Sequence, residues 1–367
     1  MNNEVRLGVI GLGGMGTHHA NYVKNGKVSR CTLAAVSDLD EKRLEQFKDI
    51  ARFTDSRELI RSGKVDAVLI ATPHYFHTTI GIDAFKNGLH AMIEKPISVH
   101  KADCERLLAA HAKTDKVFGV MFNLRTISVY KKIKDLVSRG EIGEISRVTW
   151  IVTNWFRTES YYKSGGWRAT WKGEGGGVLM NQCPHQLDIL QWVCGMPVSL
   201  RAFCKFGAKH DIEVEDEVTA YMEFANGATG TFITSTGEAP GTNRLEIAGE
   251  RGKLVLEDNK ITFTRNEVEM TKFSRTAEGM STPPVWNVQI PVEYSGGEHY
   301  LLTQNFVDAV LDGTPVIAGG SEGMNSVELA NAMVYSTLIN DTVELPIDGA
   351  KYEEALNNLI ANSKFRK

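Results

Sequence analysis

The feature that most constrains the fold is a glycine-rich loop between a short apolar strand and a helix, close to the start of the chain. Leu7, Val9 and Ile10 mark the strand, and a GxGxxG loop (Gly11, Gly13, Gly16) follows it. In a βαβ unit the first glycine allows the tight turn, the second lets a pyrophosphate approach, and the third lets helix and strand pack closely. The helix N-terminus adds N–H groups and partial positive charge. This loop therefore predicts a dinucleotide site.

Strands and helices alternate from this loop to about residue 122. The strand-like runs are nearly continuous in apolar, β-branched residues, as expected for parallel strands buried on both faces; they cover 6–10, 32–36, 65–71, 89–93 and 117–121. The helical stretches between them cover 15–25, 41–47, 76–87 and 102–113. This alternation predicts an α/β fold whose first domain, residues 1–122, is a doubly wound parallel sheet of the Rossmann type.

The pattern changes in residues 123–367, which are predicted to form a second, α+β domain that binds substrate and forms oligomers. A helix is expected over 127–139, and two more over 298–311 and 321–340. Seven successive strands with short turns indicate a large, mostly antiparallel, open-faced sheet; they cover 145–153, 199–206, 217–224, 229–236, 244–248, 253–257 and 260–265. Residues 266–297 have an irregular pattern, and the charged end 351–367 has no assigned role.

Composition excludes several classes of partner. With 41 basic and 45 acidic residues, the net charge of −4 gives no bulk attraction to nucleic acid or to anionic membranes. No apolar run reaches the roughly 18 residues of a membrane span. The five scattered cysteines lack a CxxC pair and fit a reducing compartment, so a cytoplasmic location is expected. No metal site is predicted, because HExxH and paired Cys/His spacings are missing.

The predicted cofactor is NAD. Asp38 follows the second strand, where a carboxylate accepts hydrogen bonds from the ribose hydroxyls and repels a 2′-phosphate. Lys42 and Arg43 lie close behind it and weaken this preference for NAD over NADP. The remaining predicted cofactor residues come from the loop itself, from the ends of later strands and from positions beyond them: Gly14, Met15, Thr72, Pro73, His77, Glu94, Lys95, Asn123, Trp167 and Arg168.

Two residues are predicted to be catalytic. Lys95 lies just after the strand 89–93, where an amine beside a cationic nicotinamide should have a lowered pKa and can take a proton from a hydroxyl. An ion pair with Glu94 or another carboxylate is the structural alternative. His185 follows the glycine run 175–177 and opens a helix, and imidazole titrates near neutrality. Asn181 is expected at the entry of the same helix and Asp188 on the same helix face, where packing or capping is the alternative.

A binding surface is predicted in the aromatic stretch that precedes this histidine. Five of the six tryptophans lie between Trp150 and Trp192. Aromatic faces stack on the C–H faces of sugars, while Arg, Asn and Tyr bond the hydroxyls. The substrate set is therefore Asn181, Asp188, Trp155, Arg157, Tyr161 and Tyr162. The alternative is that these aromatics close a domain interface.

Taken in order, GxGxxG, Asp38, the Ala-Thr-Pro at 71–73, the Glu-Lys-Pro at 94–96 and GGG…His185 resemble the Gfo/Idh/MocA family of sugar and inositol oxidoreductases. The resemblance implies NAD(P) in the first domain and a sugar or cyclitol at the domain junction. It further implies action of Lys95 and His185 on the reacting hydroxyl, and homodimers or homotetramers built through the open sheet. Asn181 departs from the family, which usually has aspartate there, so His185 is expected to be a poorer base or Lys95 to do more.

The Asn-Gln-Cys-Pro-His segment, with the aromatic stretch before it, is similar to members that act on glycosides, including glucoside 3-dehydrogenases. The resulting hypothesis is an NAD-dependent dehydrogenase that oxidises a ring hydroxyl of a sugar or glycoside, at C3 of a glucoside, to a ketone. Three alternatives stay open: a redox-neutral glycosidase or lyase acting through a 3-keto intermediate, an inositol dehydrogenase, and a non-catalytic NAD-binding sugar sensor.

Overall fold

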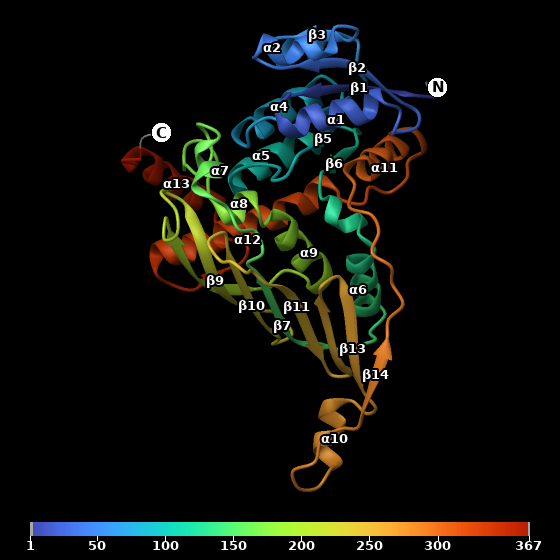
Figure 1. Ribbon diagram of the computed structural model, residues 1–367, viewed down its shortest axis with the longest axis vertical. Helices are drawn as coiled ribbons and strands as arrows, with labels where there is room; N and C mark the ends of the chain where they lie inside the picture. Colours follow the sequence, from blue (N-terminus) through green and yellow to red (C-terminus); the bar gives the residue numbers. More distant parts are fainter. Residues whose placement is uncertain (1–2, 366–367) are drawn as a thin grey trace.

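The computed structural model describes residues 3–365, which form two sheets connected by helices (Figure 1). The first sheet has the order β3-β2-β1-β4-β5-β6, and every pair is parallel. Its strands are β1 (Val5–Ile10), β2 (Cys31–Ser37), β3 (Ala51–Phe53), β4 (Ala67–Ile70), β5 (His90–Ile93) and β6 (Phe118–Val120). This is the predicted doubly wound sheet, and the order reverses between β1 and β4, where such folds bind ligands.

The helices of this first domain lie close to their predicted positions. They are α1 (Gly14–Lys24), α2 (Glu41–Leu44) with a 3₁₀ turn (Glu45–Phe47), α3 (Ser56–Arg61), α4 (Tyr75–Lys86) and α5 (Lys101–His111). β3 and α3 were not among the elements predicted from the sequence. Each has six residues or fewer, and β3 lies at the edge of the sheet, where a short half-buried strand leaves little apolar pattern.

The second sheet has nine strands in the order β14-β13-β12-β11-β7-β10-β9-β8-β15. Its strands are β7 (Ile145–Val152), β8 (Ser199–Phe206), β9 (Glu215–Glu223), β10 (Thr229–Ser235), β11 (Asn243–Gly249), β12 (Gly252–Glu257), β13 (Lys260–Asn266), β14 (Val285–Gln289) and β15 (Val343–Glu344). Only the β7–β10 pair is parallel among the described strand pairs of this sheet. The prediction of a mostly antiparallel sheet is thereby confirmed.

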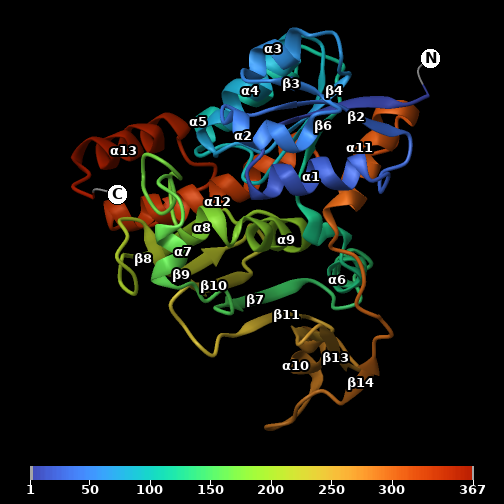
Figure 2. The ribbon, with the colours of Figure 1, turned by 45° about the horizontal axis from the view of Figure 1, so that its top comes forward.

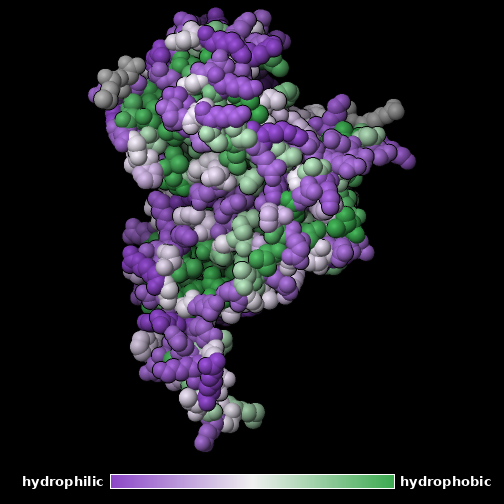
Figure 3. All heavy atoms as spheres, turned by 180° about the vertical axis from the view of Figure 1, so that it is seen from behind, coloured by the Kyte–Doolittle hydropathy of each residue, from purple (hydrophilic) through white to green (hydrophobic). Residues whose placement is uncertain are grey.

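The two faces of this sheet differ. Along β9, buried and exposed residues alternate, so that one face packs inward and the other stays open. The inner face is covered by α6 (Ser128–Ser138), α9 (Pro184–Cys194) and α12 (Gly320–Ile339), and Figure 2 shows these helices stacked above the strands. Figure 3, from behind, shows hydrophobic residues gathered in patches among polar ones.

The predicted irregular segment 266–297 contains regular structure. It holds α10 (Met270–Thr276) and β14, and α10 projects beyond the edge of the sheet (Figure 1). The tail that had no assigned role forms α13 (Gly349–Asn362), which packs against α5. Within residues 3–365, no helix combines the length and the apolar character that crossing a bilayer requires.

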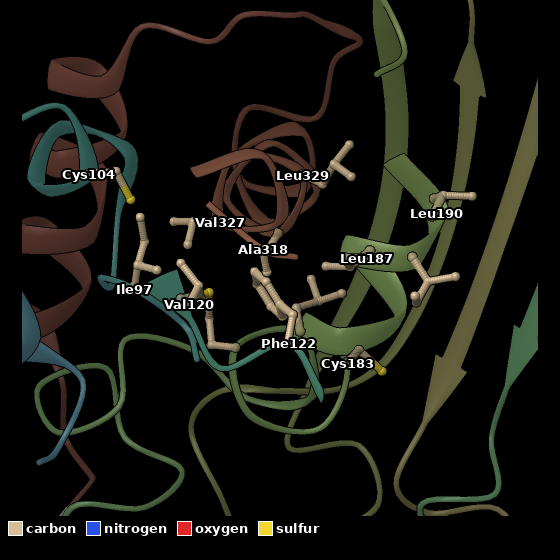
Figure 4. Packing of buried hydrophobic residues seen from close by; sticks show 14 of the residues in the cluster. Ile97, Cys104, Val120, Phe122, Cys183, Leu187, Leu190, Ala318, Val327 and Leu329 are labelled. Carbon is tan, nitrogen blue, oxygen red and sulfur yellow. The ribbon is translucent and has the colours of Figure 1, made fainter. Parts of the chain in front are cut away.

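The C-terminal helices return to the first domain. In α11 (His299–Asp312), Leu302 and Phe306 are buried in one cluster with Leu7 and Val9 of β1. A second cluster continues through α12, and Figure 4 shows side chains of this cluster, among them Val120 of β6 and Leu187 of α9. The boundary at residue 122 stays a prediction, but the first domain's core includes residues from the end of the chain.

Candidate active site

A cleft of about 1310 Å³ lies along the carboxyl ends of β1, β2, β4 and β5. The loop 164–168 from the second domain forms its far wall. Most of the predicted cofactor residues and one substrate residue line it: Gly11, Gly13, Gly14, Met15, Asp38, Thr72, Pro73, His77, Glu94, Lys95, Trp167, Arg168 and Asn181. The tertiary structure therefore brings these residues, which are far apart in sequence, to one cleft.

The glycine loop has the close packing that a pyrophosphate site requires. A Cβ on Gly16 would stand 1.6 Å from the carbonyl oxygen of Gly11, so only glycine fits where α1 crosses β1. A Cβ on Gly13 would meet no protein atom within 4 Å, and Gly13 lines the cleft. The loop is thus tight on its protein side and open on its cleft side, which fits a bound phosphate group.

Asp38 holds the loop and faces the cleft. Its Oδ2 accepts a hydrogen bond from the Leu12 N–H at 2.6 Å, and its Oδ1 accepts one from the Asp40 N–H at 2.9 Å. The guanidinium of Arg43 lies 3.4 Å from Oδ2. A carboxylate in this place fits the hydroxyls of an adenosine ribose better than a 2′-phosphate.

His77 joins the ends of two neighbouring strands. Its Nδ1 lies 2.8 Å from the carbonyl oxygen of Pro96, and its Nε2 lies 2.8 Å from that of Thr72. Both ring nitrogens are thus engaged by backbone, so His77 supports the cleft wall. The Thr72 hydroxyl is buried without a hydrogen-bond partner among the described residues, which leaves it available to a cofactor.

The side chains of Glu94 and Lys95 do not form an ion pair with each other, which was one alternative to a catalytic role for Lys95. Glu94 is buried, and its Oε1 lies 2.6 Å from Nε2 of His19 on α1. Burial opposes the charged form of Glu94, but this hydrogen bond and the charges of His19 and Lys95 lower its pKa to about 2. Glu94 therefore remains ionised and tied to α1, and the side chain of Lys95 points elsewhere.

The Lys95 amine reaches the second domain. Its Nζ donates to the carbonyl oxygen of Asn181 at 2.8 Å. Burial lowers the pKa of Lys95, while the nearby charges of Glu94 and Glu174 act in the opposite direction. An amine with a lowered pKa loses its proton more readily than an ordinary lysine, which suits it to accept a proton from a hydroxyl.

His185 lies on the first turn of α9, as the Cys-Pro before it predicted. Its Nδ1 is buried without a described partner, and its ring packs edge-on against Phe122. Burial and the charge of Lys95 lower the pKa of His185 to about 3. The imidazole is therefore neutral above about pH 5 and can accept a hydrogen bond or a proton from a hydroxyl.

The glycine run before these residues permits a close backbone approach. A Cβ on Gly175 would stand 2.0 Å from the Val99 side chain, and one on Gly177 would stand 2.0 Å from the Glu215 carbonyl oxygen. The buried Glu215 carboxylate accepts hydrogen bonds from the backbone N–H groups of Gly177 and Leu179. This contact fixes the start of α8 (Val178–Asn181), at whose end Asn181 meets Lys95.

The aromatic stretch forms an alternating stack. The Arg157 guanidinium lies over the rings of Trp155 and Tyr161, at 5.2 and 4.9 Å from their centroids. The Arg168 guanidinium lies over the rings of Tyr161 and Trp167, at 5.0 and 4.7 Å from their centroids. The Tyr161 hydroxyl accepts from both Arg168 and Gln182, so the stack abuts the turn between α8 and α9.

Two of the predicted substrate residues were assigned wrongly. Asp188 is fully buried and pairs with Arg125 through two hydrogen bonds of 2.6 and 2.8 Å, so it cannot reach a substrate. The Asp188 side chain therefore has a packing role, which was the alternative given for it above. Tyr162 is 4% exposed, and its hydroxyl lies 2.8 Å from that of Thr236. Adjacent residues of a short helix point in different directions, and the aromatic pattern did not show which one faces inward.

Only one of the two polar side-chain atoms of Asn123 has a hydrogen-bond partner among the described residues. Its Nδ2 donates to the carbonyl oxygen of Gly297, while its Oδ1 is buried without a partner among the described residues. Asn123 is not among the residues that line the cleft described above. Its assignment as a cofactor residue stays a prediction.

Two buried charged residues that bond predicted site residues were not themselves predicted from the sequence. Glu174 is 2% exposed and bonds the Asn181 side chain; the only signal in the sequence was its place directly before the glycine run. Arg125 is buried between Asp188 and Glu322, and nothing in the sequence set it apart from other arginines. The described residues contain no group of three or more His, Cys, Asp or Glu that could hold a metal ion.

Comparison with family models gives two matches that together cover most of the chain. Residues 5–122 match the model of an oxidoreductase family with an NAD-binding Rossmann fold. Residues 130–255 match the GFO/IDH/MocA C-terminal domain.

Individual relatives are distant. A myo-inositol 2-dehydrogenase of Thermotoga maritima is 28% identical over 270 residues, which are 70% of this chain and 77% of the relative. A levoglucosan dehydrogenase of Pseudarthrobacter phenanthrenivorans is 24% identical over 388 aligned positions, covering 94% of this chain and 98% of the relative. Among solved structures, the WlbA dehydrogenase of Chromobacterium violaceum, in complex with NADH and UDP-GlcNAcA, has a TM-score of 0.81 at 25% identity, covering 95% of this chain and 98% of that chain.

Proposed function

The chain belongs to the Gfo/Idh/MocA family of NAD-binding oxidoreductases, and from that premise we propose that it oxidises a ring hydroxyl of a sugar or glycoside to a ketone, with C3 of a glucoside as the preferred position. The single observation that carries this proposal is the contact between the Lys95 amine and Asn181. It places an amine of lowered pKa, from the cofactor domain, against the turn that leads to His185.

The proposed reaction divides between cofactor and protein. NAD, when bound, supplies the acceptor for the hydride that leaves the carbinol carbon. The neutral Lys95 amine takes the hydroxyl proton as the C=O bond forms, and His185 orients the same hydroxyl by accepting a hydrogen bond. Asn181 and the stack of Arg157, Tyr161 and Arg168 bind other hydroxyls and the apolar faces of the sugar.

Replacement of Lys95 by Met tests this assignment. The variant should lose at least about 100-fold in kcat, the lower range for removal of an acid–base group. NAD should still bind, because the glycine loop and Asp38 are unchanged. The measurements are NADH formation with methyl glucosides and levoglucosan, and NAD binding by calorimetry. Near wild-type turnover by the variant would overturn the assignment of Lys95.

Inositol oxidation is a second candidate, favoured by the similarity to the myo-inositol 2-dehydrogenase. Adding myo-inositol to the same assay separates the two. A higher kcat/KM for myo-inositol than for every glucoside would replace the glycoside proposal. NADH that never accumulates while a glycoside is cleaved would indicate the redox-neutral reaction. A sensor would bind a sugar without converting it.

We also propose that the enzyme forms a homodimer or homotetramer through the open sheet face. Phe203 and Tyr221 are 60% and 45% exposed on this face, and contact with a second copy of the chain would bury them. The double substitution F203E/Y221E should shift the mass measured by light scattering to that of a monomer. An unchanged mass would exclude this face. The five free cysteines support function in a reducing compartment such as the cytoplasm.

A further inference from the structure

Asn181 stands where an aspartate was expected, and the buried carboxylate of Glu174 lies against it. We propose that Glu174 is a positioning residue that acts through Asn181: it holds the amide so that Oδ1 faces the reacting hydroxyl, and it supplies the negative charge opposite Lys95. This inference rests on the proposed function, because it assigns Glu174 a role in the reaction attributed to Lys95.

The hydrogen bonds of Glu174 fix the orientation of the amide. Its Oε1 accepts from Nδ2 of Asn181, and its Oε2 accepts from the Ala169 N–H at 2.6 Å. An ionised carboxylate has only acceptors, so the NH₂ group of Asn181 must face it. The Oδ1 atom of Asn181 is then directed away from Glu174, and Asn181 lines the cleft.

Asn181 also holds the lysine. Its backbone carbonyl oxygen accepts from Lys95 Nζ at 2.8 Å, while its side chain is bound by Glu174. The carbonyl oxygen of Glu174 accepts from His74 Nδ1 at 3.2 Å, which ties the same residue to the cofactor domain. Glu174, Asn181 and Lys95 therefore form one connected group across the domain junction.

The charges agree with this arrangement. Burial raises the pKa of Glu174, whereas its two hydrogen bonds and the charges of Arg168 and Lys95 oppose that rise. Glu174 in turn favours the protonated form of Lys95. The other titratable or charged groups around the two residues are Glu94, His74, His77, Tyr162, Arg168, Cys183, His185, Glu215 and His299.

An exchange of the two side chains tests the pairing. N181D places a second carboxylate against Glu174, so kcat and the melting temperature should both fall. E174Q offers one acceptor to two donors, so either the Ala169 N–H or Asn181 Nδ2 loses its partner, and kcat should fall about tenfold or more. In the double variant E174Q/N181D, the introduced amide can donate to the introduced carboxylate, and both quantities should recover beyond the sum of the single effects.

The pH profile separates a role in the reaction from a purely structural one. Removal of the Glu174 charge should shift the acid limb of kcat/KM to lower pH, because Lys95 then loses its proton more easily. The matched control is E213Q. Glu213 also accepts a hydrogen bond from this loop, at the Trp171 N–H, but it has no contact with Asn181. E213Q should lower the melting temperature and leave the acid limb unmoved.

The probes are methyl glucosides, levoglucosan and myo-inositol with NAD. An E174Q acid limb equal to that of the wild type, or a double variant no better than N181D, would overturn the role of Glu174 alone. If the wild-type enzyme reduces NAD with none of these probes, the result would count against the proposed function. The catalytic part of this inference would then fall with it. The melting temperatures would then still decide whether Glu174 and Asn181 act as a pair.

Discussion

The two walls of the cleft are built in different ways. The cofactor wall consists mainly of backbone, from the glycine loop and the strand ends, and its buried Glu94 has a pKa lowered by His19. The wall that we propose binds substrate, here called the substrate wall, contains Ser164, Gly165, Trp167, Arg168 and Asn181. Three carboxylates whose pKa values burial raises lie in or beside the segment that carries it: Glu174, Asp188 and Glu215. The first wall is thus specified by local backbone geometry, and the second depends on buried charges brought together by tertiary packing.

The largest expected effect tests the cofactor wall. G16A places a Cβ 1.6 Å from the Gly11 carbonyl oxygen, so the free energy of unfolding should fall by more than about 3 kcal/mol, the upper range for overpacking. Denaturant unfolding measures this loss. The matched control G13A, with open space around its Cβ, should keep the wild-type stability and weaken NAD binding at least about tenfold. Similar stability losses in both variants would show that the loop is not tight on one side only.

The second test concerns the charges of the substrate wall. D188N leaves the buried Arg125 without its bidentate partner, and the free energy of unfolding should fall by about 3 kcal/mol. E322Q neutralises the other partner of Arg125. Because the Glu322 side chain is 42% exposed, the free energy of unfolding should fall by less than about 1 kcal/mol. NAD affinity should not change in either variant. Equal losses would mean that burial does not distinguish the two partners.

The third test uses pH. Burial raises the pKa of Glu215 from 4.5 to about 7, so the folded state binds a proton that the unfolded state has released. Stability should therefore fall as pH rises from about 4.5 to about 7. E215Q should remove this dependence and be more stable at pH 8 by up to about 3 kcal/mol. The control E217Q changes a partly exposed carboxylate on the same strand, whose pKa is lowered by Lys205 rather than raised, so its stability should still fall from about pH 4.5 to about pH 7.

The smallest effect concerns cofactor choice. D38N retains an acceptor for the Leu12 N–H but removes the charge that repels a 2′-phosphate. The KM for NAD should rise about tenfold, in line with a hydrogen bond to a charged group of roughly 1.5 kcal/mol. The ratio of kcat/KM for NADP over NAD should rise as well, since Arg43 is close enough to bind phosphate. An unchanged ratio would mean that the backbone alone selects the cofactor.

The sequence predicted the cofactor wall better than the substrate wall. The glycine loop, Asp38 and Lys95 were placed correctly in the cleft because each follows a strand, and the carboxyl ends of parallel strands meet at one edge. Asp188 and Tyr162 were misassigned because the sequence does not show whether a polar or aromatic side chain faces a ligand or another part of the core. Glu174 carried too weak a signal, since a glutamate before glycines is usually a surface residue.

By itself, the amino-acid sequence determined the α/β organisation, the dinucleotide loop and the place of Lys95 in the cleft, because strand periodicity, glycine spacing and strand ends are local properties. Only the tertiary structure decided which charges are buried together. Arg125 met Asp188 because α9 packs against the 3₁₀ turn at residues 123–126. Glu174 met Asn181 within one short segment, and the two came to lie near Lys95 because this segment packs against the first domain. These arrangements depend on packing between segments that are distant in the chain, and no local pattern encodes them.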